Sequence, residues 1–313
     1  MTVSHRHVPV AMLVLACLFW GMGFSWAKNV GEAINAAAGR PIDGPLGPLV
    51  GLTGRFLVAG LLWFALVPAV RRNWTWRTVR RGTVIGFMLS LALILQHVGL
   101  GLSDEAVIAF LTNLTVVFVP LWVLLATRRW PRPAVLTAVP IALAGMALLS
   151  GLRTNWTAST GVSAGAWWGV ACAAAFAAEI LLLDRLGRDE SPERITLLLF
   201  VTAFVLCAVT AVALPGFGRI HWPAVGRIAL GWDFVLLTGL TTVAAFSIMT
   251  RCQPRVDPTR AAVIYLAEPL FAAVFAWVHN ARSMSADALA GAGLILLANI
   301  VAEVRGRRVR SEP

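Results

Sequence analysis

Charged residues are scarce in this sequence. They make up 13% of the 313 residues, whereas 58% are hydrophobic. Soluble domains carry roughly twice that share of charged residues, so the composition argues against a soluble fold. Apolar stretches of about 20 residues, long enough to cross a bilayer, follow one another with short charged joints between them. The sequence therefore predicts a protein whose solvent is a membrane.

Cysteine and lysine are almost absent as well. The four cysteines lack the paired spacing of a zinc site or of a secreted disulfide framework, and we interpret them as packing residues. Lys28 is the single lysine among 26 basic residues, and the arginines are scattered over short loops. No extended basic face results, so a nucleic-acid partner is not predicted.

Motifs of catalysis are also missing. The sequence has no nucleotide-binding glycine loop, no metal-ligand spacing and no serine elbow in a strand–turn–helix setting. We therefore predict no enzymatic activity, no catalytic residue, no metal and no cofactor, and transport driven by ATP is not favoured.

The apolar stretches predict an all-α integral membrane protein with ten transmembrane helices. We place them at about 8–27, 46–70, 82–102, 105–127, 133–152, 163–183, 195–215, 228–250, 257–278 and 284–304. Arginine-rich joints are retained in the cytoplasm, and most arginines fall on the side of the two termini, the densest group being Arg71, Arg72, Arg77, Arg80 and Arg81. A multi-pass protein of the inner membrane with both termini in the cytoplasm is predicted.

An internal repeat relates the two parts of the chain. The run AFLTNLTVVFVPLW at 109–122 can be laid on IYLAEPLFAAVFAW at 264–277 with a constant shift. Five predicted helices separate the copies, and an odd number makes the second copy insert upside down. We predict two inverted five-helix repeats, residues 1–152 and residues 153–313, the second ending in a short basic cytoplasmic tail.

The sequence resembles the EamA-type members of the drug/metabolite transporter superfamily. The resemblance rests on LFWGMGFSWAK (18–28), the pair Arg55-Phe56, FLTNLTVVFVPLW (110–122) and AEPLFAAVFAW (267–277). It implies two five-helix repeats and transport, but no particular cargo. Family members often carry a Gly-Glu pair after the fourth and ninth helices, where this chain has Thr127-Arg128 and Asn280-Ala281-Arg282, so no role of that carboxylate can be carried over.

Glu268 is the main candidate for a transport site, because a carboxylate near the bilayer centre is costly unless it is paired or hydrated. Pro269 follows it, lacks an N–H and leaves the carbonyl of Tyr265 without its usual helical partner. Glu268 and Tyr265 would then line a substrate or proton site at a kink. The alternative is that Glu268 only braces the kink.

Asn113 occupies the matching place in the first repeat, with Pro120 as a second predicted kink. Asn113 can line the same cavity or serve as a hydrogen-bonding link between helices. Arg55 is the basic residue predicted deepest in a span, and it would bind a substrate carboxylate, form a structural ion pair or act as a gate.

Further polar and aromatic candidates lie in other predicted spans. Gln96 and His97 lie toward the outer end of the third predicted span, where His97 would titrate in a proton-coupled cycle or simply be hydrogen-bonded. Trp20, in the first predicted span, would form a cavity wall or pack against its neighbours. Glu179 would reach out to water or mark the inner mouth of a pathway.

These features predict a secondary transporter, by analogy an exporter, of small polar or amphipathic metabolites such as amino acids, working by alternating access. Its partners would be the substrate and membrane lipids, with coupling to protons or exchange down a solute gradient, as a monomer or a homodimer. The alternatives are an exchanger of phosphorylated or nucleotide sugars, which needs more basic groups than Arg55, and a membrane enzyme acting on lipid-linked substrates.

Overall fold

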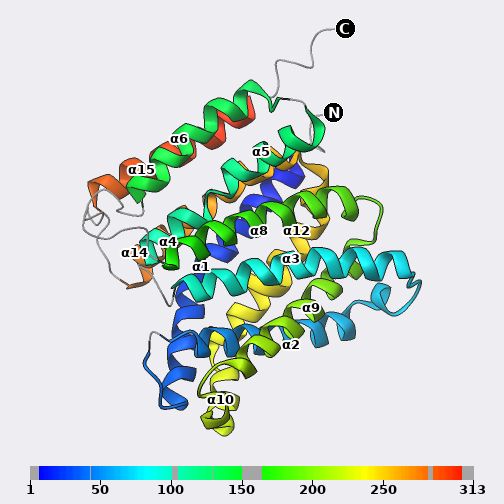
Figure 1. Cartoon of the computed structure of the whole chain (residues 1–313), viewed down its shortest axis with the longest axis vertical. Coiled ribbons are helices and arrows are strands. Elements are labelled where there is room, and N and C mark those ends of the chain that lie inside the picture. The colour runs from blue at the N-terminus through cyan, green and yellow to red at the C-terminus, as the bar shows by residue number, and fades with distance from the viewer. Residues whose placement is uncertain are drawn as a thin grey trace.

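The chain folds into helices packed side by side (Figure 1). The structure is a computed structural model that describes residues 7–42, 44–100, 105–128, 130–149, 164–280 and 285–304. These ranges contain no β-strand. The predicted basic tail after residue 304 and the start of the predicted second half, residues 153–163, lie outside the described residues.

The elements of the first part have the following bounds: α1 Val8–Ala37, α2 Leu46–Leu66, η2 Pro68–Arg71, α3 Trp76–Leu100, α4 Glu105–Thr112, α5 Thr115–Thr127 and α6 Pro133–Leu149. Those of the second part are α8 Ala164–Gly187, α9 Pro192–Ala213, η3 Phe217–Arg219, α10 Trp222–Ala229, α11 Trp232–Leu236, η4 Leu237–Ala244, α12 Ala245–Cys252, η5 Gln253–Arg255, α13 Pro258–Tyr265, α14 Ala267–Asn280 and α15 Ala286–Val304.

Seven helical segments of the described chain are long and apolar enough to cross a membrane. They are Val8–Ala37, Leu46–Leu66, Trp76–Gly99, Ile108–Thr127, Pro192–Ala213, Trp232–Arg255 and Pro258–Phe275. Two shorter apolar helices, Pro133–Leu149 and Ala286–Ala302, join them. The all-helical membrane architecture is thus confirmed, whereas ten spans in two inverted repeats stay a prediction.

Three of these segments are not regular α-helices throughout. The fourth predicted span is interrupted at Asn113 and Leu114, between α4 and α5, and the ninth at Leu266, between α13 and α14. The eighth contains a π-helical stretch, η4, in which the backbone turns are wider. Such irregular backbone is tolerated at membrane depth only where protein or a polar cavity surrounds it.

Glycines let α1 lie unusually close to its neighbours. A Cβ atom added at Gly21 would lie 2.7 Å from the backbone nitrogen of Ala272 in α14, and one at Gly23 would lie 2.6 Å from Thr241 in η4. Farther along, a Cβ atom added at Gly31 would lie 3.0 Å from the ring of Pro48 in α2. Helix α1 therefore has direct backbone contact with both parts of the chain.

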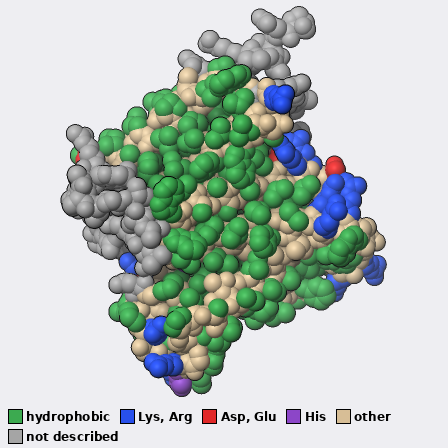
Figure 2. Space-filling view, viewed as in Figure 1, with side chains coloured by type: hydrophobic (Ala, Val, Ile, Leu, Met, Phe, Trp, Pro, Cys, Tyr) green, Lys and Arg blue, Asp and Glu red, His purple; other side chains and the backbone are tan. Residues whose placement is uncertain are grey.

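The largest cluster of buried apolar side chains joins α1, α2, α3 and α9 with the η4–α12 segment; its aromatic members include Trp26, Phe56, Phe200 and Phe246. Helices α6 and α15 form a separate pair along one edge (Figure 1), with Met146 and Ile295 buried between them. Figure 2 shows a broad hydrophobic face, with Lys and Arg gathered at its borders, as a surface that contacts lipid tails requires.

The contact between α6 and α15 depends on two facing glycines, Gly145 and Gly291. A Cβ atom at Gly291 would lie 2.5 Å from the carbonyl oxygen of Gly145 and 2.6 Å from the backbone nitrogen of Leu149. Gly291→Ala should therefore push the helices apart and lower stability by about 1–3 kcal/mol, the usual cost of overpacking. Thermal unfolding followed by intrinsic fluorescence measures the loss.

Gly293→Ala is the matched control, because the space beside Gly293 in the same helix is open. Alanine favours helices over glycine by about 0.5–1 kcal/mol, so this variant should be as stable as the wild type or slightly more stable. Equal melting temperatures for the two variants would contradict the assigned close contact.

Candidate functional site

The interruption between α13 and α14 brings Trp20, Tyr265 and Glu268 together. Helix α13 ends at Tyr265, and Pro269, in the first turn of α14, has no N–H to offer the carbonyl of Tyr265. A Cβ atom at Gly21 would lie 2.8 Å from the carbonyl oxygen of Glu268. This approach of α1 sets the preceding residue, Trp20, against the Tyr265 ring, with the centroids 5.6 Å apart and edge to face.

Trp20 also ties the π-helical stretch to this joint. Its indole N–H donates to the carbonyl of Thr241 at 3.1 Å, and its ring packs against Phe246 with the centroids 5.4 Å apart. Within η4, the hydroxyls of Thr241 and Thr242 both donate to the carbonyl of Leu237. The wider turns of the π-helical stretch thus leave the carbonyl of Thr241 accessible to the indole N–H of Trp20.

A buried chain of hydrogen bonds leads from Tyr265 to α8. The Tyr265 hydroxyl donates to Gln253 Oε1 at 2.6 Å, and Gln253 Nε2 donates to the carbonyl of Ile180 at 3.0 Å. Gln253 is fully buried. On the other side of the joint, the thiol of Cys17 in α1 points to the carbonyl of Ile264 at 3.6 Å. Four segments therefore meet around one tyrosine.

Two carboxyl groups flank this tyrosine without a cationic partner. Glu179 and Glu268 are both in electrostatic contact with Tyr265. Glu179 is 2% exposed, and its Oε1 atom is buried without a hydrogen bond. Glu268 is half-buried and makes no hydrogen bond or ion pair with the described residues. We call Glu179, Glu268, Tyr265, Gln253 and Trp20 the acidic cluster.

Arg55 belongs to a different cluster. It lies in electrostatic contact with His97 of α3 and Cys207 of α9, and its Nε atom is buried without a hydrogen bond. No ion pair joins it to a carboxylate of the described chain. The guanidinium instead lies 5.1 Å from the centroid of its neighbour Phe56.

The two clusters are linked by aromatic rings. Phe56 packs against Phe246 with centroids 5.9 Å apart, and Phe246 packs against Trp20. That Arg55 and Glu268 line one cavity stays a prediction. His97 lies with Arg55, and its Nδ1 atom is 2.7 Å from the carbonyl of Leu93, one turn earlier.

The remaining predicted residues occupy separate places. Asn113 lies at the interruption between α4 and α5, where its amide donates to the carbonyl of Ala109 at 2.7 Å. Helix α5 continues through Pro120, so the break in this span falls at Asn113 and Leu114 and not at the proline. Gln96 is half-buried beside His97 in α3.

Sequence reasoning missed one member of the acidic cluster, Gln253, and the π-helical stretch whose carbonyl bonds to Trp20. Gln253 stands next to a predicted loop and gave no signal of burial, and the π-helical stretch leaves no mark in hydropathy. Glu179 was a candidate because it is a carboxylate inside an alanine-rich apolar run. It was expected to reach water or the inner mouth of a pathway, and in the structure it is buried near Tyr265.

The apolar helices and the arginine-rich joints define a multi-pass membrane protein. Residues 163–302 match the profile of the EamA-like transporter family, which belongs to the drug/metabolite transporter superfamily. This part of the chain is thus an EamA-like transporter region, and the resemblance inferred from the sequence is confirmed. No curated protein matches the chain.

A solved structure whose title reads "Crystal structure of protein" is similar over the whole chain. It superposes with a TM-score of 0.72 at 20% sequence identity, over 98% of this chain and 100% of that one. At this identity the likeness shows the fold alone.

The isolation of Arg55 gives a prediction about stability. A buried cation without a partner can be replaced by an apolar side chain at little cost, whereas removal of one member of a pair leaves the other uncompensated. Arg55→Met should therefore keep the melting temperature within about 2 °C of the wild type. Arg81→Met should lower stability by about 1–2 kcal/mol, because Arg81 Nη1 lies 3.2 Å from the buried carboxylate of Glu190.

Thermal unfolding of both variants in one detergent measures the difference. A large loss of stability in Arg55→Met would show that Arg55 braces the helices. Retained stability with lost transport would instead give Arg55 a role in the transport cycle.

Proposed function

We propose that the protein is a secondary transporter that exports small polar or amphipathic metabolites, in particular amino acids or related amines, across the inner membrane. Alternating access between two inverted halves, with both termini in the cytoplasm, would expose the site to one side at a time. The observation that carries the proposal is the acidic cluster: two carboxyl groups at an interrupted membrane helix, with no cationic side chain paired to them.

The charge of the cluster favours a cationic group on the substrate. An ionised carboxylate at membrane depth is costly unless it is neutralised by a proton or by a cation. Since neither Glu179 nor Glu268 has a basic partner in the described chain, a proton or a substrate ammonium group would fill this role. The rings of Trp20 and Tyr265 offer faces that attract cations as well as apolar contact.

Competition between these two occupants would couple transport to protons. A carboxyl group that holds a proton cannot at the same time pair with an ammonium group, so loading of one would release the other. The cluster is also built from α1 of the predicted first half and from α8, η5, α13 and α14 of the second. A site shared by the two halves is the arrangement that alternating access requires.

Transport in proteoliposomes tests this proposal. Wild-type protein, offered a pooled mixture of amino acids, amines and other metabolites, should move amine-bearing compounds faster when a pH gradient is applied, as read by mass spectrometry. Glu268→Gln cannot be ionised and should lower gradient-driven transport at least about tenfold, the range found for groups that take part in proton transfer.

Glu32→Gln is the matched control. Glu32 lies in α1, is partly exposed and forms only a surface pair with Lys28 at 3.9 Å, so its loss should leave transport unchanged. Gradient-independent movement that persists in a folded Glu268→Gln protein would rule out Glu268 as the coupling group. Transport of anionic compounds alone would rule out the proposed substrate class.

Tyr265 is the only tyrosine in the chain, and this permits a direct test of binding. Protein grown with 3-fluorotyrosine should give a single ¹⁹F resonance from the centre of the acidic cluster. A transported amine should shift this resonance, because it would change the charge beside the phenol, and an untransported analogue should not. If no transported compound shifts the resonance, the substrate binds elsewhere in the protein.

A further inference from the structure

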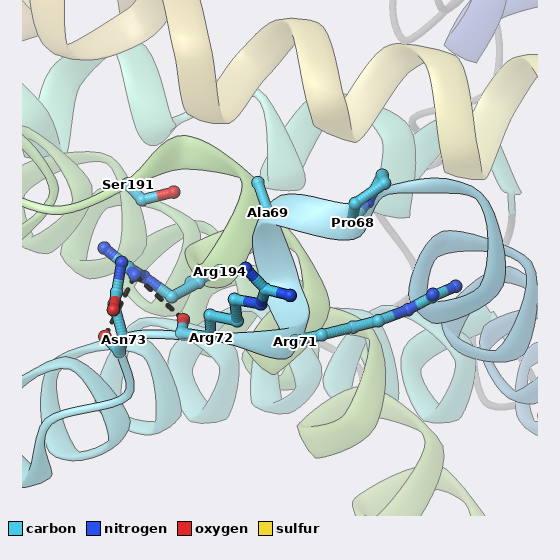
Figure 3. A pocket seen from close by; sticks show the side chains of 7 residues that line it. All are labelled: Pro68, Ala69, Arg71, Arg72, Asn73, Ser191 and Arg194. Atoms are coloured by element: carbon cyan, nitrogen blue, oxygen red, sulfur yellow. Dashed lines mark hydrogen bonds between the residues drawn. The ribbon is translucent and has the colours of Figure 1, made fainter.

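A hollow of about 620 Å³ lies where α2 ends and α9 begins. Figure 3 shows the residues that line it: Pro68, Ala69, Arg71, Arg72, Asn73, Ser191 and Arg194. Three of the seven are arginines and none is acidic. The hollow is at the end of two candidate membrane spans, Leu46–Leu66 and Pro192–Ala213, and none of its lining residues belongs to the acidic cluster.

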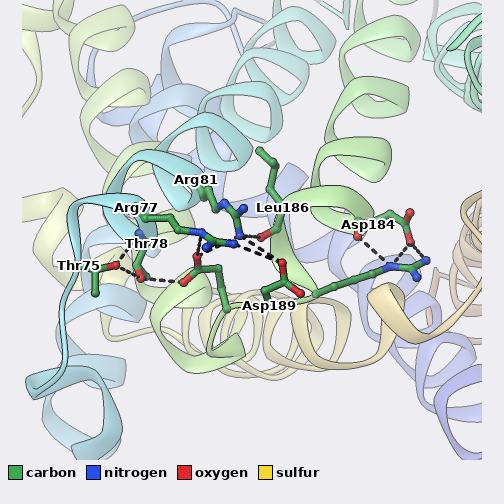
Figure 4. A network of polar contacts seen from close by, with 9 residues as sticks. Thr75, Arg77, Thr78, Arg81, Asp184, Leu186 and Asp189 are labelled. Atoms are coloured by element: carbon green, nitrogen blue, oxygen red, sulfur yellow. Dashed lines mark hydrogen bonds and ion pairs between the residues drawn. The ribbon is translucent and has the colours of Figure 1, made fainter.

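The neighbouring arginines on this edge of the protein are neutralised by carboxylates. Arg77 and Arg81 pair with Asp189 and Glu190, and the Thr78 hydroxyl donates to Glu190 (Figure 4). Farther on, Arg188 pairs with Asp184 at 2.6 Å and Arg251 with Glu193 at 2.5 Å. The acidic groups near the hollow are thus already engaged.

The arginines of the hollow have no such partners in the described chain. Arg71 donates to the carbonyls of Phe64 and Ala65 at the end of α2, and Arg194 donates to the carbonyls of Arg72 and Asn73. Arg194 Nε is buried without a hydrogen bond, and the side chain of Arg72 makes no hydrogen bond or ion pair with the described residues. Three positive charges are left uncompensated around one hollow.

Backbone geometry adds to this positive potential. Helix α9 is 22 residues long and begins at Pro192, directly after Ser191, so the positive end of its dipole lies beside the hollow. The Ser191 hydroxyl is engaged by Glu193, whose carboxylate is also held by Arg251. The arginines, and not this serine, must therefore supply the charge contacts.

The surroundings of the hollow are those of a lipid headgroup region. Phe64 and Leu66, at the membrane end of the same turn, are 51% and 75% exposed, and Trp74 is 38% exposed on the other flank. Exposed apolar and tryptophan side chains beside basic groups mark the boundary between acyl chains and water. A ligand bound here can place its charged part among arginines and its apolar part along α2.

We propose that this hollow binds the phosphate of an anionic phospholipid, with Arg72 as the principal charge contact and Arg71 and Arg194 completing the basic wall. Arginine suits a phosphate because its planar guanidinium can give two parallel hydrogen bonds. Basic pockets between membrane helices are a known form of headgroup site. The bound lipid would stabilise the contact between the η2 turn, at the end of α2, and the start of α9.

Native mass spectrometry of the full-length protein in detergent tests the proposal. Titration with phosphatidylglycerol should show one tightly held molecule, with phosphatidylcholine held more weakly. Arg72→Gln should weaken phosphatidylglycerol binding about fivefold, the effect of one basic residue at a membrane surface, and Arg72→Glu should weaken it further. The Arg72 side chain makes no hydrogen bond or ion pair with the described residues, and its carbonyl, which accepts from Arg194, is kept in both variants, so both should fold.

Arg80→Gln is the matched control, since it removes the same charge from the first turns of α3, outside the hollow. It should bind phosphatidylglycerol as the wild type does. Equal weakening by Arg72→Gln and Arg80→Gln would overturn the site, as would equal binding of the two lipids. Glycerol 3-phosphate that binds as tightly as phosphatidylglycerol would overturn the lipid assignment in favour of a soluble phosphate.

Discussion

The close approach of α1 to three other helices is the constraint on which the rest of the structure depends. Side chains larger than hydrogen at Gly21 and Gly23 would collide with the backbone of α14 and with Thr241, and Gly31 meets Pro48. These contacts place Trp20 between Tyr265 and Phe246, where its N–H meets the carbonyl exposed by the π-helical stretch. Two of the three irregular segments, the joint at Leu266 and η4, are thus covered by one helix. Since open backbone is tolerated in a membrane only when protein surrounds it, the position of α1 makes the acidic cluster possible.

The sequence predicted the elements better than it predicted their irregularities. Hydropathy located helical segments near each expected range because the bilayer imposes length and composition on a span. Hydropathy could not locate the π-helical turns of η4, because these depend on the register of backbone hydrogen bonds and not on polarity. It also could not locate the break at Asn113, because Pro120 offered a stronger local signal for a kink. That Trp20, Tyr265, Glu268 and Arg55 line one transport cavity stays a prediction. In the structure Trp20 packs against Tyr265, and Arg55 lies near His97 and Cys207. Depth in the bilayer does not say toward which neighbouring helix a side chain points, so the sequence could not give these contacts.

Charge is distributed in opposite ways at the centre and at the edge of the protein. Among the described residues, the two carboxyl groups of the acidic cluster lack cationic partners and the three arginines of the basic hollow lack anionic ones, whereas Arg77 and Arg81 are paired with Asp189 and Glu190. Matched pairs hold helices in register and resist change. Unmatched groups of one sign are unfavourable on their own, so they are informative about what binds: a proton or an ammonium group in the first case and a phosphate in the second.

The length of α1 has a consequence for the surrounding bilayer. With 30 residues and a rise of about 1.5 Å per residue, α1 reaches about 45 Å. The hydrocarbon layer is about 30 Å thick, so α1 must tilt across it or extend beyond it. Because Gly21, Gly23 and Gly31 hold α1 close to α14, η4 and α2, a change in the tilt of α1 would move these segments with it. The thickness of the membrane should therefore act, through α1, on the joint at Leu266 and on the π-helical stretch.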